Sequence, residues 1–137
     1  MGVEGPKSFQ NEVALEWVSE LAEYTDLSGA AGAIDAVMTD KADYLDADVC
    51  QEGIAAAEVV AAAAGKPAAD LPDAVKSWIG GKPKPDAALV AKTFEAIAAI
   101  REKSELREFW EDSDDLAGWN TAMDELKGRL DAAKSAA

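Results

Sequence analysis

Apolar residues recur at helical spacing along most of the chain, and no segment alternates apolar and polar residues as a half-buried strand does. The clearest case runs from Asn11 to Tyr24, where valine, alanine, tryptophan, leucine and tyrosine side chains share one side of a helix. Glutamates fill the opposite side, and Asn11 is a favourable N-cap. The pattern predicts a surface helix with one buried face.

Four further segments show the same periodicity and have recognisable ends. They are Gly29 to Thr39 with Ser28 as cap, Pro72 to Ile79, a helix that starts at Pro85 or Asp86, and Leu116 to about Ala133. The third of these leaves two alternatives open. It continues through to Trp110, or it restarts at Ser104 with that serine as a new cap.

The stretch from Ile54 to Gly65 is the least polar in the chain and consists mainly of alanine. A helix that is apolar on every side has to be surrounded by protein. Gly65 followed by Pro67 is a strong stop signal for such a helix. We therefore expect a central, alanine-rich helix over about residues 48–64, against which the other helices pack.

Length and composition favour one helical domain. The 137 residues fit a single domain, residues 1–137, and 49% hydrophobic with 29% charged residues is typical of globular proteins. Alanine is abundant and β-branched residues are sparse, which favours helix. The predicted fold class is all-α, a single-domain bundle of about five to six helices around the central helix.

The net charge of −14 is concentrated in the first part of the chain. Residues 1–60 hold thirteen acidic residues against Lys7 and Lys41. A field of this sign repels nucleic acid and anionic membranes, and it speeds the encounter with a basic protein. We expect a basic protein partner, no nucleic acid or membrane ligand, and a monomer. Solubility alone is the competing explanation of the charge.

The cysteine and histidine content excludes several kinds of site. The chain has no histidine and one cysteine, Cys50, so zinc sites of Cys and His, Ser-His and Cys-His catalytic pairs and disulfides within the chain are excluded. The aspartates from Asp40 to Asp48 lack the glycine and the spacing of a calcium-binding EF-hand loop. No cofactor is expected, and Cys50 is expected to be a small apolar filler.

The chain also lacks the patterns that direct a protein to a membrane. Its start has neither a basic nor an apolar leader segment, and its longest weakly polar run is too short to span a bilayer. We expect a cytoplasmic protein. Of the four tryptophans, Trp78 stands beside a flexible connector and is expected to be the most exposed.

Glu58 is the one charged residue in the apolar stretch and the sharpest candidate for chemistry. Such a glutamate lies at a gap in the surrounding layer or is paired inside it. Without a nearby cation its pKa rises, and it then suits acid or base chemistry. The structural alternative is pairing with Arg101, Arg107, a tryptophan N–H or a free helix end. Glu58 is thus the candidate binding residue, and no catalytic or metal-binding residue is assigned.

Several motifs in order carry a family resemblance. They are Met1, Gly2, Gly5, Phe9 and Asn11 at the start, then A-L-E-W (Ala14 to Trp17), A-A-x-E-V-V-A-A (Ala55 to Ala62), S-E-L-R-E-F-W-E (Ser104 to Glu111) and E-L-K-G-R-L (Glu125 to Leu130). Together they resemble the bacterial domain of unknown function 4259 family. The tryptophan usual near the family's start is replaced by Glu4, and its Asn-Asp by Asn11-Glu12. The resemblance implies a small bacterial helical protein and supplies no activity.

The sequence therefore leaves the biochemical function unknown and yields two hypotheses. The favoured one is a small, acidic, non-enzymatic protein that docks another protein through its negative N-terminal half. An immunity or antitoxin-like protein that covers a basic active site is one concrete version. The alternative is an enzyme or ligand-binding protein that uses the buried carboxylate of Glu58 in a pocket. A concave pocket that reaches Glu58 would keep the alternative open, and a fully packed surround would end it.

Overall fold

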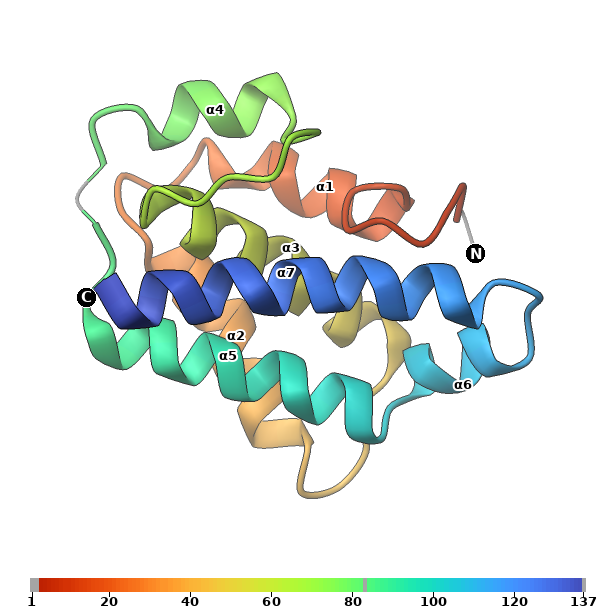
Figure 1. Cartoon of the computed structure of the whole chain (residues 1–137). Coiled ribbons are helices and arrows are strands. Elements are labelled where there is room, and N and C mark those ends of the chain that lie inside the picture. Colours follow the sequence, from red (N-terminus) through yellow and green to blue (C-terminus); the bar gives the residue numbers. More distant parts are fainter. Residues whose placement is uncertain (1–2, 83, 137) are drawn as a thin grey trace.

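The computed structural model describes residues 3–82 and 84–136, and within them the chain forms seven helices and no strand (Figure 1). The helices are α1 (Glu12–Leu21), α2 (Ser28–Asp40), α3 (Ala47–Ala63), α4 (Asp73–Ile79), α5 (Ala87–Glu102), α6 (Glu105–Glu111) and α7 (Leu116–Ala136). The all-α prediction is confirmed, with seven helices in place of the expected five to six. Met1 and Gly2, which contribute to the family-like start, lie outside the described residues.

Polar N-caps set the starts of four helices. The side chains of Asn11, Asp46, Asp86 and Ser104 each accept a hydrogen bond from the backbone N–H three residues later. Ser104 settles the open alternative, because it ends α5 by donating to the carbonyl of Ile100 at 2.8 Å and starts α6 by accepting from the backbone N–H of Arg107 at 3.0 Å. This restart accounts for the additional short helix.

Two predicted helix ends are wrong. Helix α1 stops at Leu21, three residues before the predicted end, because the backbone N–H groups of Glu23 and Tyr24 turn to carbonyls three residues back. Tyr24 consequently lies outside the buried face and is 44% exposed. Ser28 does not cap α2; it is the first residue of that helix, and its N–H donates to the carboxylate of Asp26 at 2.9 Å.

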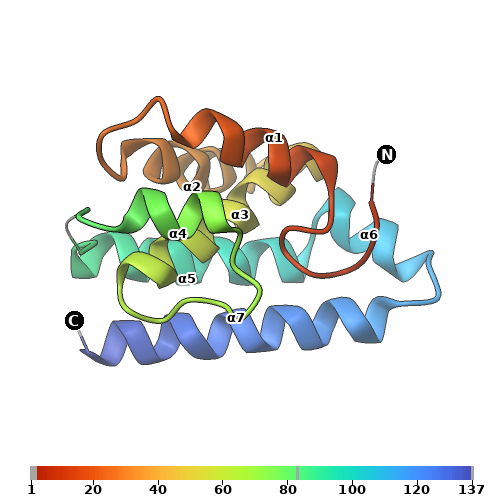
Figure 2. The same ribbon diagram turned by 90° about the horizontal axis from the view of Figure 1, so that it is seen from above.

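Helix α3 runs through the middle of the molecule and contacts each of the other six helices described. Figure 2 shows α7 along one side of the molecule and α1 and α2 on the opposite side, with α3 between them. Nearly all of α3 is buried because its small side chains let neighbouring helices approach closely. One close approach is at Gly53, where an added Cβ would lie 2.6 Å from a methyl carbon of Val37 on α2.

Two irregular segments lie along α7. The N-terminal segment, residues 3–10, folds back on itself, with the N–H of Glu4 donating to the carbonyl of Gln10 at 2.8 Å. The α3–α4 loop, residues 64–72, runs beside the same helix (Figures 1 and 2). Both segments therefore reach the side chains of α7. None of the helices within residues 3–82 and 84–136 has the length and apolar character needed to cross a membrane.

Candidate functional site

Glu58 lies in the middle of α3 and is only 3% exposed. Its Oε2 accepts a hydrogen bond from the Ser8 hydroxyl at 2.6 Å, and its Oε1 lies 2.8 Å from Nη2 of Arg129 on α7. The expected arginine partners are wrong. Arg101 of α5 instead pairs with Asp124 of α7, and Arg107 pairs with Glu111 four residues further along α6. The true partner was missed because it depends on how α7 lies against α3.

Arg129 joins three parts of the molecule. On its own helix it forms two charge-assisted hydrogen bonds with Glu125, one of them at 2.8 Å from Nη2. Its Nη1 donates to the carbonyl of Lys66 in the α3–α4 loop at 3.1 Å. With Glu58 and Ser8, this guanidinium ties α7 to α3, to the loop and to the N-terminal segment. The spacing of Glu125 and Arg129, four residues apart on a helix, was a visible signal for part of this cluster.

Glu58 and Glu125 both contact Arg129, but their pKa values shift in opposite directions. Burial raises the pKa of Glu58, and the charge of Arg129 and the hydrogen bond from Ser8 offset that rise only in part. The hydrogen bond from Arg129 lowers the pKa of the more exposed Glu125. Each oxygen of Glu58 is thus held by one neighbour, Ser8 or Arg129, and the carboxylate is nearly inaccessible to water.

A pocket of about 620 Å³ reaches Glu58. We call it the Glu58 pocket. Its walls come from the N-terminal segment, the α3–α4 loop and the first half of α7, and the side chains besides Glu58 that matter most are Ser8, Asp70, Thr121, Ala122 and Glu125. A concave pocket that reaches Glu58 is therefore present, so the hypothesis of a ligand-binding role for this residue stays open.

Other candidate groups give no reactive site. Cys50 is fully buried, and its burial raises the pKa of the thiol to about 12, which leaves it protonated at neutral pH. This agrees with its expected role as a small apolar filler. Asp46 is the N-cap of α3, and the described part of the chain contains no group of three or more Cys, Asp or Glu side chains placed to hold a metal ion.

The tryptophans follow their predicted burial. Trp17, Trp110 and Trp119 are buried, whereas Trp78 is half-buried and donates from its indole N–H to the carbonyl of Tyr24 at 3.0 Å. Lys82 lies over the Trp78 ring, 4.7 Å from its centroid. This aromatic ring thus serves to fix α4 and the chain that follows it.

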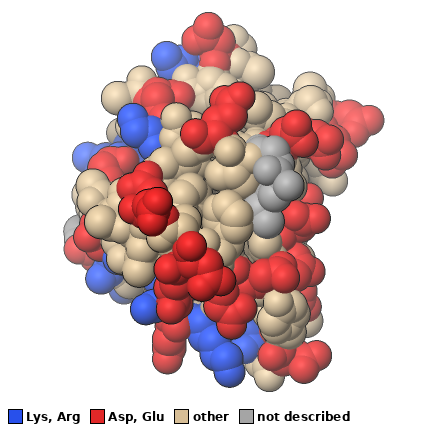
Figure 3. Space-filling view, turned by 90° about the vertical axis from the view of Figure 1, so that its right-hand side faces the viewer, with Lys and Arg blue, Asp and Glu red and all other residues tan. Residues whose placement is uncertain are grey.

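Acidic side chains gather where α1 and α3 lie side by side. Partial burial raises the pKa of Glu52, and the negative charges of Glu20, Asp48, Asp46 and Glu16 raise it further. We call these five residues the acidic face. Figure 3 views the molecule from the side at which α1 and α3 begin, and acidic side chains reach its right-hand edge, where no basic side chain is visible.

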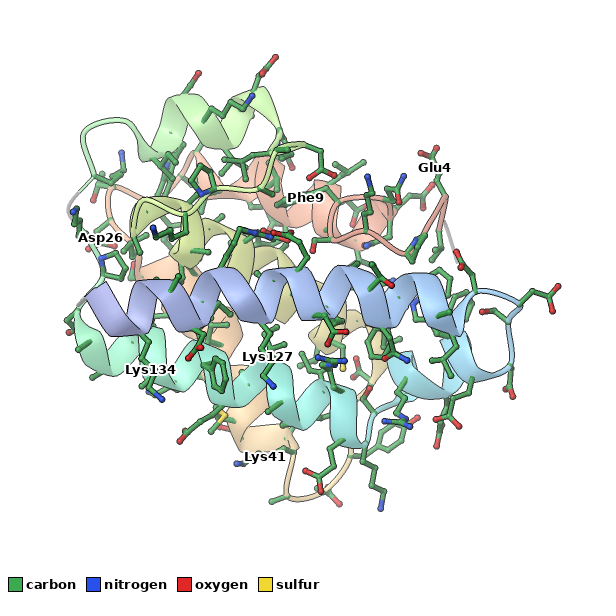
Figure 4. The ribbon with its side chains drawn as sticks, viewed as in Figure 1. Glu4, Phe9, Asp26, Lys41, Lys127 and Lys134 are labelled. Carbon is green, nitrogen blue, oxygen red and sulfur yellow. The ribbon has the colours of Figure 1, made fainter. Side chains whose placement is uncertain are left out.

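Basic side chains gather instead along α5 and α7. Lys127 and Lys134 extend from α7 toward α5 (Figure 4), where their ammonium groups lie 5.8 Å and 5.2 Å from the centroid of the Phe94 ring. Lys92 on α5 pairs with Asp35 of α2 at 2.8 Å. The charge asymmetry seen along the sequence is therefore also an asymmetry in space.

Comparison with known proteins identifies a family whose function is unknown. No curated protein matches this chain, and no solved structure matches it. A family model described as a domain of unknown function, DUF4259, matches residues 2–122. The match ends within α7, so Glu125 and Arg129 lie beyond it, as does the E-L-K-G-R-L motif. Because the model covers most of the 137 residues, the chain belongs to the DUF4259 family.

Proposed function

We propose that this protein docks a basic partner protein in the cytoplasm through its acidic face. The observation that carries the proposal is the position of Glu16, Glu20, Asp46 and Asp48 around Glu52, whose pKa is raised first by partial burial and further by these four negative charges. Five carboxylates placed so that they repel one another are costly to the isolated protein. A basic surface laid against them removes that repulsion and is attracted from a distance.

Exposed apolar side chains beside these charges support a protein partner. Leu15 is 49% exposed on α1 next to Glu16, and Tyr44 is 55% exposed before α3. A hydrogen bond to Glu105 raises the pKa of Tyr44, and Glu108 and Asp46 are close enough to add to that shift. Aromatic side chains among charged groups are typical anchors of protein interfaces. In this proposal, electrostatic attraction brings the basic partner to the acidic face, and Tyr44 and Leu15 provide apolar contact area.

An immunity or antitoxin-like role is the concrete version of this proposal. A basic active site that binds phosphate-containing substrates would be covered by such an acidic face. Helix α3 serves as the central scaffold, since it contacts every other described helix and carries Asp48 and Glu52 at its first turns. Catalysis by Glu58 is not favoured, because the residue is only 3% exposed and its carboxylate is held by Ser8 and Arg129.

Affinity capture at low and high salt tests this proposal. The protein is immobilised, and the captured protein is expected to be basic and to be released when salt is raised, because screening weakens long-range charge attraction. The variant Glu16→Gln/Glu20→Gln/Glu52→Gln is expected to capture much less of it. Capture that is insensitive to both salt and this variant would contradict the proposal.

A further inference from the structure

We propose that the Glu58 pocket is a binding site for a small organic amine that carries an apolar body. Its volume of about 620 Å³ lies in the range of ligand sites in proteins, roughly 300–1,000 Å³. Pro6, Ala69, Gly118 and Ala122 line it with carbon and leave room for a ligand, because none of them has a long side chain. This site shares no residue with the acidic face, although both include residues of α3.

The hydroxyl groups of the pocket select for hydrogen-bond donors. The proton of Ser8 is committed to Glu58 at 2.6 Å, and that of Thr121 is committed to the carbonyl of Ala117 at 3.0 Å. A hydroxyl whose proton is already donated has only lone pairs to offer to a ligand. Both hydroxyls therefore present acceptors toward the pocket, which suits a ligand N–H group.

The charges of the pocket select in the same direction. Glu58, Asp70 and Glu125 contribute three carboxylates, and Lys7 is the one cationic residue among the described lining residues. Arg129 is not among the lining residues, and its guanidinium is engaged by Glu58, Glu125 and the carbonyl of Lys66. A positively charged ammonium is favoured here over a carboxylate or phosphate.

Glu58 acts in this site as a positioning residue. Its carboxylate holds the Ser8 proton, so the lone pairs of that hydroxyl remain available, and it fixes the N-terminal segment as one wall. The ammonium of the ligand is held by Ser8, Asp70 and Glu125, and its apolar body lies against Ala122 and Gly118.

Titration with three probes of similar size tests the proposed selectivity. Phenethylamine, phenethyl alcohol and hydrocinnamate are added to the protein, and the backbone amide resonances of Ser8, Asp70, Gly118 and Thr121 are followed by NMR. Phenethylamine is expected to shift these resonances saturably, with a dissociation constant of about 1 mM or below. Hydrocinnamate is expected to leave them unmoved. Equal responses to the amine and the acid, or no saturable response to the amine, would overturn the proposal.

Paired variants locate the site. Thr121→Trp fills the pocket from an exposed position and is expected to abolish amine binding, whereas Ala132→Trp, also exposed on α7, leaves it intact. Asp70→Asn is expected to weaken binding by about tenfold, while Asp131→Asn, with the same change in net charge, does not. Unchanged binding in both Thr121→Trp and Asp70→Asn would overturn the proposal.

Nα-Acetyl-lysine methylamide, which keeps its side-chain ammonium, tests whether the pocket binds a small amine or the lysine side chain of a partner protein. It has the ammonium but lacks the compact apolar body, so it is expected to bind more weakly than phenethylamine. Tighter binding of the blocked lysine would overturn the assignment to a small molecule. Failure of the acidic-face proposal would leave every one of these results unchanged, since none of the altered residues belongs to that face.

Discussion

At the scale of single residues, the cluster around Arg129 compensates the buried negative charge of Glu58. Glu58 is nearly inaccessible to water, and Arg129 is the cation that lies against it. Removing one partner of a buried ion pair costs more than forming the pair contributes, because the remaining charge is left without compensation. Replacing Arg129 is therefore predicted to cost much more stability than replacing Arg107, whose side chain is more exposed.

Arg129→Met is expected to lower the free energy of unfolding by about 3 kcal/mol at neutral pH. The variant leaves Glu58 buried without its cation, which raises the pKa of that carboxyl further. A raised pKa in the folded state favours the protonated form, so the stability attached to Glu58 is present below about pH 4 and is lost as the pH rises through the folded-state pKa. The cost of the variant should accordingly shrink as the pH falls. Urea unfolding at several pH values measures this.

Arg107→Met is the matched control for that prediction. Arg107 also pairs with a glutamate four residues away and donates to a backbone carbonyl, that of Arg101, but no buried carboxylate faces it. Because its pair with Glu111 is half exposed, the substitution is expected to cost about 1 kcal/mol or less. Equal costs for the two variants, or a cost for Arg129→Met that does not depend on pH, would show that Glu58 needs no cation.

Cys50 should be unreactive as long as the protein is folded. It has no exposed surface and its thiol pKa is about 12, so iodoacetamide at about pH 8 meets almost no thiolate. Labelling should be many-fold slower than in urea-unfolded protein and should follow the opening of the structure. Rapid labelling of the folded chain, detected by mass spectrometry, would contradict the buried position.

Residue-scale features were only partly predictable from the sequence. A charge in an apolar helix drew attention to Glu58, and the flexible connector beside Trp78 identified it as the most exposed tryptophan. The partners of Glu58 were not predictable, because Ser8 and Arg129 come from the two ends of the chain and meet α3 only after the helices have packed. No local spacing rule links residues so far apart.

At the scale of helices, periodicity and capping residues predicted most elements and several starts. Asn11 was recognised because its short polar side chain satisfies an N–H that a helix leaves unpaired. Helix ends were less predictable, since Tyr24 continues the apolar period while its backbone already turns. The close approach of α2 and α3 at Gly53 also escaped notice, because it depends on how two separate helices pack.

Gly53→Ala is expected to destabilise the protein by about 1–3 kcal/mol, although alanine is the better helix former. The added methyl group would lie 2.6 Å from a methyl carbon of Val37, so α2 and α3 would have to separate. Gly32→Ala and Gly128→Ala are the controls: an added Cβ there has no neighbour within 4 Å, and each should stabilise its helix by up to about 1 kcal/mol. Urea unfolding midpoints compare the three. A gain for Gly53→Ala like that of the controls would contradict the tight α2–α3 contact.

At the scale of the whole molecule, the uneven distribution of charge along the sequence becomes an uneven distribution of charge over the surface. Seven of the thirteen acidic residues of residues 1–60 lie on α1, α2 and the start of α3, whereas Lys127 and Lys134 of α7 lie against Phe94 of α5. The sequence predicted the sign of this field. It did not predict the particular grouping of Glu16, Glu20 and Glu52, since that requires α1 and α3 to lie side by side.

Two triple variants of equal net charge separate a docking face from charge in general. Glu16→Gln/Glu20→Gln/Glu52→Gln neutralises three residues of the acidic face. Asp35→Asn/Glu95→Gln/Asp131→Asn neutralises three exposed acids on α2, α5 and α7. Both variants should remain folded by circular dichroism, because all six side chains are exposed or half-buried.

The affinity of the captured basic partner for these two variants, measured at low salt, is the most direct test of the acidic face. The first variant should bind at least about tenfold more weakly than the unmodified protein, and the second should bind within about twofold of it. Equal losses in the two variants would show that only total charge matters. That result would contradict the assignment of docking to the surface formed by α1 and α3.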